Sequence, residues 1–374
     1  MRMRDILLLI LCCTILASCE DDNQVVVNQD DPDLIAIDYA PNTYDLNLHD
    51  SLPFMDIPAD NPMTVAGVDL GRHLFYDPIM SSDSTISCSS CHNLKKGFSD
   101  PSALSFGVNG ATGTRNSMSL LNIGFAKNGL FWDGRARTLE EQAIEPIEAV
   151  FEMNETWENV EAKLRRSEFY PAMFRKAFGI TKRSEITQDL VVKALAQFER
   201  TLVVYGGSKY DKVVLGLVPG LKLEDEEADG VLMYFDIPGD DFPDAECFHC
   251  HGDVLFGGDD YFNNGLTEAE DLDAFPDLGR GAFTGNILDN GRFKAPSLRN
   301  IALTAPYMHD GRFQTLEEVL DHYNSGGHPS PNKNELVLDL GLSDYQKSAI
   351  IAFLHTLTDT SYYDNPAFAN PFEE

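Results

Sequence analysis

Two copies of a Cys-x-x-Cys-His motif hold the side chains of this chain that are best suited to chemistry. The copies consist of Cys88, Cys91 and His92 and of Cys247, Cys250 and His251. The two thiols of such a motif can form thioethers with the two vinyl groups of one haem, and the next histidine then lies beneath the iron as its proximal ligand. A zinc site or two strained disulfides are the alternative uses of four such thiols. The histidine directly after each pair favours two covalently attached c-type haems.

The remaining cysteines, Cys12, Cys13 and Cys19, lie in a segment typical of an export signal. Two arginines precede an apolar run over 6–17, which is shorter than the roughly 20 residues that a membrane-spanning helix needs. Residues 16–19 read Leu-Ala-Ser-Cys and resemble a bacterial lipobox, with ordinary cleavage as the alternative. We therefore expect 1–18 to be a lipoprotein signal peptide and 19–45 a flexible acidic tether. The mature protein would be exported and tethered by a lipid on Cys19, on the periplasmic side or at the cell surface.

Length and charge narrow the classes of function. The chain has 374 residues, of which 43% are hydrophobic, so it is long enough for two domains with their own cores. It carries 28 Lys and Arg against 60 Asp and Glu, a net charge of -32. Such a charge repels phosphate backbones, which argues against a nucleic-acid partner and favours partners with a basic surface.

The regions after the two haem motifs repeat each other. Residues 119–123 correspond to 297–301 at an offset of 178, and 132–135 correspond to 309–312 at an offset of 177. Between His92 and His251 the offset is only 159, so an insertion of about eighteen residues should lie after His251, within 257–285. We expect two tandem cytochrome c-like haem domains, an N-terminal domain over 46–206 and a C-terminal domain over 207–374.

The elements that must position these motifs are mainly α-helices joined by long loops. Three capping boxes precede apolar residues at helical spacing. They are Thr138 with Glu141, Thr315 with Glu318 and Ser343 with Gln346. A further helix is predicted before the domain boundary near 206, where apolar residues recur at helical spacing from Leu190 to Leu202.

The repeat predicts different distal sides for the two irons. Tyr323 lies on the apolar face of the helix expected after Thr315, and the offset of 177 pairs it with Pro146. One iron would then be offered a phenol oxygen, while the other would meet a ring that cannot bind it. Gln142 lies one turn before Pro146 and Glu152 follows it, and a carboxylate beside an open iron suits peroxide chemistry. A buried core tyrosine and a solvated glutamate are the alternatives.

Several short motifs outside the Cys-x-x-Cys-His pairs are also characteristic. They are Leu70–Phe75, Arg115–Asn116, Phe131–Arg135, Glu152–Met153 and Ala305–Gly311. Together with the haem motifs they resemble the bacterial family of di-haem cytochrome c peroxidases and MauG, over roughly residues 60–360. The resemblance implies that the first haem reacts with peroxide, with Gln142 and Glu152 on its distal side, and that the second passes electrons, with Trp132 between them.

The resemblance also implies a calcium ion between the domains. Its protein ligands would be the side chain of Asn116 and the backbone carbonyls of Thr304 and Pro306, with waters completing the oxygen shell that calcium prefers.

Two positions depart from the peroxidase pattern. Peroxidases that need reductive activation have a removable histidine in a Gly-His pair, where this chain has Gly107-Val108. They also have methionine over the second iron, where this chain has Tyr323, as MauG does. A hard, anionic phenolate favours ferric iron, so it should lower the reduction potential. Rival ligands for this position are His73, Met308 and His309.

We therefore predict an enzyme that reduces hydrogen peroxide to water. Its electrons would come from a small periplasmic cytochrome c or cupredoxin. The alternatives are MauG-like, peroxide-dependent oxidation of a protein substrate, and passive electron carriage by two closed haems. A homodimer is compatible with any of these functions.

Overall fold

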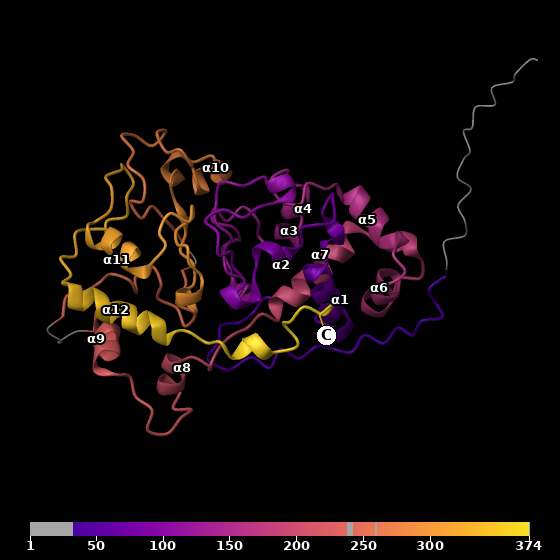
Figure 1. The fold of residues 1–374 in the computed structure, drawn as a ribbon, viewed down its shortest axis with the longest axis horizontal. Helices are drawn as coiled ribbons and strands as arrows, with labels where there is room; N and C mark the ends of the chain where they lie inside the picture. Colours follow the sequence, from indigo (N-terminus) through magenta and orange to yellow (C-terminus); the bar gives the residue numbers. More distant parts are fainter. Residues whose placement is uncertain (1–32, 238–241, 259, 374) are drawn as a thin grey trace, which may run out of the picture.

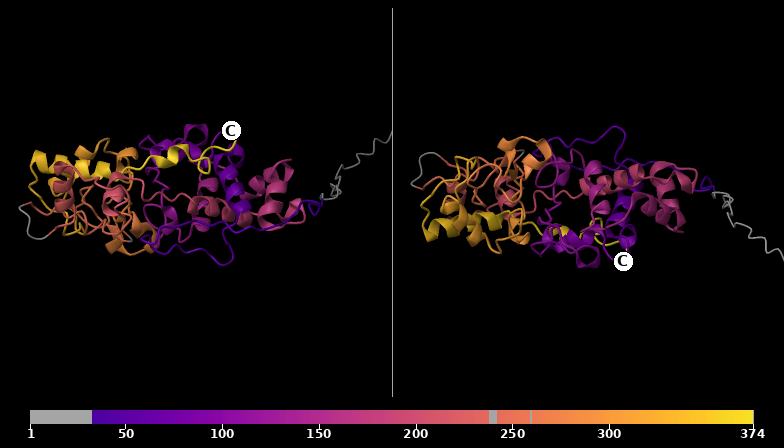
Figure 2. Two further views of the ribbon diagram at one scale, coloured as in Figure 1. Left: turned by 90° about the horizontal axis from the view of Figure 1, so that it is seen from below. Right: turned by 90° about the horizontal axis from the view of Figure 1, so that it is seen from above.

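The computed structural model describes residues 33–237, 242–258 and 260–373, and these residues are mainly helical. The two halves of the chain form two lobes that lie end to end along the longest axis of the molecule (Figures 1 and 2). The first lobe contains α1 (Val65–Tyr76), α2 (Cys88–Cys91), α3 (Leu139–Gln142), α4 (Glu145–Glu148), α5 (Trp157–Arg166), α6 (Tyr170–Phe178) and α7 (Gln188–Arg200). The second contains α8 (Lys209–Val214), α9 (Asp225–Tyr234), α10 (Arg280–Thr284), α11 (Leu316–Asn324) and α12 (Asp344–Thr356). Strands β1 (Tyr261–Phe262) and β2 (Phe293–Lys294) form a small antiparallel sheet in the second lobe.

Each lobe is built around one close helix crossing. In the first lobe α1 packs on α7, and a Cβ added at Gly71 would lie 2.0 Å from the carbonyl oxygen of Ala194. In the second lobe α9 packs on α12, and a Cβ added at Gly230 would lie 2.1 Å from the carbonyl oxygen of Ala349. Only glycine lets the two backbones approach so closely, so the two lobes share one packing device.

A second contact also occurs once in each lobe. Asn122 donates from Nδ2 to the carbonyl of Val204 (3.1 Å), and its Oδ1 accepts from the amide of Val204 (2.9 Å). Asn300 forms the same pair of hydrogen bonds with Asp359, at 2.7 and 3.1 Å. Both asparagines are buried. The repeat in the sequence is thus accompanied by equivalent contacts in the structure.

The capping boxes have different outcomes. Those of Thr315 and Ser343 are complete and begin α11 and α12, which confirms two of the predicted helix starts. At Thr138 the hydroxyl caps the amide of Glu141, but the Glu141 carboxylate accepts from the amide of Arg137 instead of completing the box. The helix that begins there, α3, ends after four residues. The helix predicted before 206 is confirmed as α7, with its apolar face buried.

Both ends of the described chain pack on the first lobe. Leu34 is buried in the core of that lobe, and the ring of Tyr39 lies 5.6 Å from the guanidinium of Arg175. The expectation of a flexible tether is therefore wrong from Asp33 to Asp45, because apolar residues there find partners in the first lobe. At the other end, Tyr362 and Phe368 belong to the first core. The segment after α12 runs back along the first lobe to the C-terminus (Figures 1 and 2).

The predicted signal peptide (1–18), the lipid-bearing Cys19 and residues 20–32 of the tether lie outside the described residues. Within the described part of the chain, we find no helix whose length and hydropathy would let it cross a bilayer.

Candidate functional site

The first Cys-x-x-Cys-His motif presents its histidine in the form that an iron needs. Cys88 and Cys91 lie on α2, and His92 follows directly. The Nδ1 of His92 lies 2.9 Å from the carbonyl oxygen of Phe98. Since a carbonyl can only accept, Nδ1 carries the hydrogen and the lone pair of Nε2 stays free for a metal. Burial lowers the pKa of His92, which keeps the imidazole neutral.

The second motif repeats this geometry. The Nδ1 of His251 lies 2.9 Å from the carbonyl oxygen of Pro296, and burial lowers the pKa of His251 as well. All four motif cysteines are free of disulfides. Among the described residues, the side chains close enough to share a metal ion are Asp244, Glu246 and His249, a group that includes none of these thiols. The structure therefore favours neither the disulfide nor the zinc alternative.

A cavity of about 300 Å³ lies beside the second motif. Cys247, Cys250 and His251 form part of its wall, and Met308 and Tyr323 also line it. Apolar side chains of α11 and α12 also line it, among them Leu316, Leu320 and Leu354. Two thiols, a neutral imidazole and an apolar lining fit a covalently attached haem.

Tyr323 lines this cavity near the end of α11. Burial raises the pKa of its phenol to about 12, and its oxygen accepts a hydrogen bond of 3.3 Å from Asn264. Met308 and His309 also line the cavity, but the His309 ring is stacked on Phe293 with a centroid distance of 3.6 Å.

The third rival ligand is in the first lobe. His73 lies on α1 between the rings of Phe169 and Phe372, and it is absent from the lining of this cavity. Tyr323 and Met308 thus line the cavity of the second lobe without the ring stacking that holds His309.

The residues expected around calcium meet at the same cavity, on its side toward the first lobe. Asn116, Thr304 and Pro306 all line it, together with Trp132. The Nδ2 of Asn116 donates to two backbone carbonyls at 3.1 Å each, so its Oδ1 is the atom left for a cation. The indole of Trp132 donates to the carbonyl of Asn116 (2.8 Å), and the carbonyl of Trp132 accepts from the amide of Lys294 (2.8 Å). Trp132 thus lies at the contact between the lobes.

Glu152 lies beside the first motif. Its backbone carbonyl accepts from the amide of Val108 at 2.8 Å. Burial raises the pKa of its carboxyl, while the charge of Arg135 lowers it and that of Glu145 raises it. Burial raises the pKa of Cys91 to about 11, and the negative charges of Asp100 and Glu152 add to this shift.

Gln142, the other residue expected on this distal side, is the last residue of α3 and is half-buried. The amide of Met153, next to Glu152, donates to the carbonyl of Pro146 at 3.1 Å, which ties the Glu152 turn to α4. The structure thus joins Glu152 to the segment that carries Pro146.

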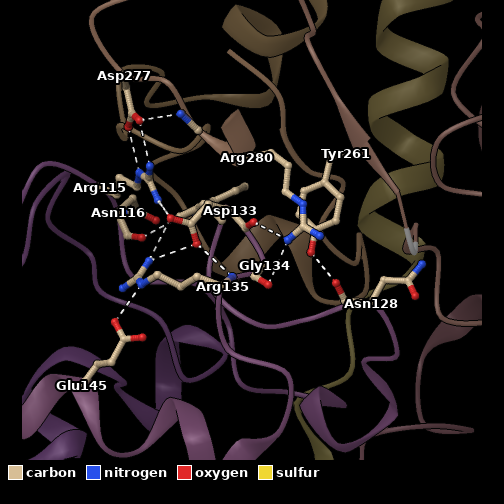
Figure 3. Close-up of polar contacts among 12 residues, drawn as sticks. Arg115, Asn116, Asn128, Asp133, Gly134, Arg135, Glu145, Tyr261, Asp277 and Arg280 are labelled. Atoms are coloured by element: carbon tan, nitrogen blue, oxygen red, sulfur yellow. Dashed lines mark hydrogen bonds and ion pairs between the residues drawn. The ribbon is translucent and has the colours of Figure 1, made fainter. Parts of the chain in front are cut away.

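A chain of ion pairs leads from the insertion in the second lobe to this region (Figure 3). Arg115 binds Asp277 through Nη2 at 2.7 Å and Asp133 through Nη1 at 2.6 Å. Arg135 then binds Asp133 at 3.1 Å and Glu145 at 2.7 Å. These ion pairs link the insertion to the first lobe, and the chain of pairs ends at Arg135 and Glu145, whose charges act on Glu152.

Sequence reasoning did not identify Glu199 or Asn264. Burial raises the pKa of Glu199 to about 8, and one of its oxygens is buried without a hydrogen-bond partner. Its charge also contributes to the raised pKa of Cys88. A glutamate on a helix as buried as α7 is the signal that could have revealed Glu199. For Asn264 the sequence offers no such signal, because it lies in an irregular loop of the insertion.

Comparisons with known proteins agree with these observations. A family model described as di-haem cytochrome c peroxidase matches residues 65–218. The chain is 36% identical to the cytochrome c551 peroxidase of Nitrosomonas europaea, over 85% of this chain and 86% of that protein. It is 35% identical to the methylamine utilization protein MauG of Methylorubrum extorquens, over 80% of each. The solved structure of a MauG-like protein associated with microbial copper homeostasis has a TM-score of 0.80 at 33% identity, and the match covers 88% of this chain and all of that one. Because the similarity to these relatives spans both haem motifs, the chain belongs to the family of di-haem cytochrome c peroxidases.

Proposed function

We propose that the protein is a di-haem peroxidase that reduces hydrogen peroxide to water, with one haem c in each of two tandem domains. Cys88 and Cys91 would attach the first haem, with His92 as its proximal ligand. Cys247, Cys250 and His251 would do the same for the second. The observation that carries the proposal is the pair of matching hydrogen bonds from the two histidines to backbone carbonyls, at 2.9 Å each. Haem iron supplies the redox chemistry and, where a coordination position is open, the site for peroxide.

Glu152 is the proton carrier in this proposal. Its half-buried carboxylate would take the proton from the oxygen of peroxide that approaches the first haem and return it to the oxygen that leaves as water. Gln142 would orient the peroxide through its amide. The environment of Glu152 supports this role, because burial raises the pKa of its carboxyl, which makes the carboxylate a stronger proton acceptor than that of an exposed glutamate.

We propose that the first haem has no removable histidine over its iron. At the position of the Gly-His pair, Gly107 and Val108 pack on the backbone of Phe151 and Glu152. Val108 is only 3% exposed and carries no metal-binding group. The resting ferric protein should therefore react with peroxide without prior reduction.

Tyr323 is proposed as the distal ligand of the second haem, and Trp132 as the group through which the haems exchange electrons. Asn116, Thr304 and Pro306 would hold the calcium ion at the contact of the lobes. Their common position on the cavity wall supports this assignment. The domains would run from 46 to 206 and from 207 to 374, with residues after 360 returning to the first lobe.

The electrons would come from a small cytochrome c or cupredoxin outside the cytoplasm. The net charge of -32 favours a donor with a basic docking surface. In this proposal the protein is exported and tethered to a membrane through a lipid on Cys19. A homodimer is compatible with it.

Oxidation of a protein substrate in the manner of MauG is the second candidate. The observation that favours it is Tyr323 on the cavity wall, because phenolate ligation would make the second haem a poor acceptor for ordinary donors.

A peroxide titration of the purified ferric holoprotein, followed by visible absorption, tests the proposed function. We expect the Soret band to shift at about one equivalent and to recover when a reduced donor is added. Recovery with reduced cytochromes or cupredoxins supports the peroxidase, whereas recovery only with a protein that becomes oxidised on its side chains supports the second candidate. Bands that do not move would contradict both. Separately, Tyr323→Phe should change the ferric spectrum of the second haem, and an unchanged spectrum would reject Tyr323 as its ligand.

A further inference from the structure

Asn264 lies in the insertion, two residues after β1, and its side chain faces the cavity of the second lobe. Its Nδ2 is 3.3 Å from the phenol oxygen of Tyr323 and 3.5 Å from the sulfur of Met308. One amide group therefore contacts both side chains that remain as distal ligands for the second haem.

The orientation of this amide is fixed by a neighbouring backbone group. The Oδ1 of Asn264 accepts a hydrogen bond of 3.3 Å from the amide of Leu266. An amide oxygen held by a donor leaves the NH2 group to face the cavity, so Asn264 donates to Tyr323 and Met308 and accepts from neither.

The loop that carries Asn264 is bound to α11, the helix that carries Tyr323. The ring Nε2 of His322 lies 3.0 Å from the carbonyl oxygen of Asn264, and the amide of His328 donates to the carbonyl of Gly265 at 2.7 Å. The residue before Asn264, Asn263, is also held in place: it is 3% exposed, and its Nδ2 donates to the hydroxyl oxygen of Ser330 at 2.9 Å. Asn264 and Tyr323 are therefore held relative to each other by contacts independent of any haem.

The two hydrogen bonds act on the two ligands in opposite ways. A hydrogen bond to a phenol oxygen strengthens when that oxygen becomes anionic, so the Asn264 amide stabilises Tyr323 as phenolate. A hydrogen bond to a thioether engages one of the two lone pairs of the sulfur and holds the sulfur toward the amide, so it opposes the reorientation that binding to iron would need. The same NH2 group thus favours the phenolate and restrains the sulfur.

We propose that Asn264 is a positioning residue that selects Tyr323 over Met308 as the distal ligand of the second haem. This inference rests on the proposed function, in which Tyr323 is that ligand. It also gives the insertion a role beyond the ion pairs that join the lobes, namely to place one amide donor between two competing side chains.

The test replaces the donor in the holoprotein with both haems attached. In Asn264→Leu neither hydrogen bond can form, and in Asn264→Asp the side chain keeps its size and its acceptor for Leu266 but loses the NH2 group. We expect both variants to show a sulfur-to-iron charge-transfer band in the ferric visible spectrum. We also expect the one-electron reduction equilibrium of the second haem to shift at least tenfold toward the ferrous state, about 59 mV, because methionine favours ferrous iron more than phenolate does.

Two further variants make the result specific. In Asn264→Leu combined with Met308→Leu the sulfur band should disappear and the parent spectrum should return, because no competing ligand remains. Asn286 provides a matched control, because it is an asparagine in the same lobe whose side chain is exposed. Asn286→Leu should keep the parent spectrum and the parent reduction potential of the second haem. The inference would be overturned if the Asn264 variants kept the parent spectrum and changed the reduction equilibrium of the second haem by less than threefold.

The outcomes separate this inference from the proposed function. If Tyr323→Phe changes the spectrum of the second haem while the Asn264 variants do not, only the role of Asn264 fails. If Tyr323→Phe leaves that spectrum unchanged, the assignment of Tyr323 as ligand fails first, and the role of Asn264 fails with it.

Discussion

Replacing Glu152 by glutamine removes the proton carrier and keeps the shape of the side chain. The carboxylate of Glu145, whose charge raises the pKa of Glu152, is already bound to Arg135 at 2.7 Å. We therefore expect no substitute for Glu152. General acid–base help contributes about 10²–10⁴-fold to a rate, and without a substitute we expect a loss of about 10³-fold in kcat/KM for peroxide, or about 4 kcal/mol of barrier.

The assay is stopped-flow absorption of the ferric holoprotein mixed with peroxide, at a series of pH values. Glu152 must be deprotonated to take the proton, so the rate should rise with pH through the pKa of its carboxyl. Because burial raises this pKa, the acid limb should lie above the range of an ordinary glutamate. Glu152→Gln should abolish the limb. Arg135→Gln should move it to higher pH and Glu145→Gln to lower pH, because the charge of Arg135 lowers the pKa and that of Glu145 raises it.

The control is Glu148→Gln, which removes an exposed charge from α4 and should leave the rate and its pH profile unchanged. If Glu152→Gln reacts within about threefold of the parent and keeps the acid limb, then Glu152 does not carry the proton and the reasoning from its burial is wrong.

Three other predictions concern stability, the cation and the donor. Asp211→Ala should lower the free energy of unfolding by about 3–5 kcal/mol in denaturant titrations, because Arg299, whose side chain is 4% exposed, would keep a buried charge without its 2.9 Å partner. Arg137→Ala, at an exposed pair, should cost less than about 1 kcal/mol, and equal losses would contradict the argument. If the proposed calcium site is occupied, removing calcium with a chelator should lower the rate of electron transfer between the haems, and Asn116→Ala should make the protein insensitive to added calcium; equal calcium affinity in Asn116→Ala would reject Asn116 as a ligand. The second-order rate with a basic donor should fall as salt rises, since salt screens the net charge of -32, and a rate independent of salt would reject electrostatic docking.

Local patterns in the sequence determined much of the fold and the haem motifs. The Cys-x-x-Cys-His spacing needs only one turn of chain to bring two thiols and an imidazole to one haem. The helix starts at Thr315 and Ser343 follow from hydrogen bonds within four residues, and α7 follows from its periodic apolar residues. The offset between repeats also predicted two lobes, because similar sequences form similar contacts, as at Asn122 and Asn300.

The remaining features depended on contacts between distant residues in loops without periodicity. The Val108 amide meets Glu152 across 44 positions of the chain, and Asn264 meets Tyr323 across 59. The C-terminal segment returns to the first core, and the segment before 46, expected to be a free tether, packs there as well. Such contacts are decided by shape, burial and the positions of other segments, and no pattern of neighbouring residues encodes them. The sequence by itself therefore determined the two haem-attachment motifs and the repeat, and only the tertiary structure decided which distant segments pack beside each other, such as the loop of Asn264 beside Tyr323.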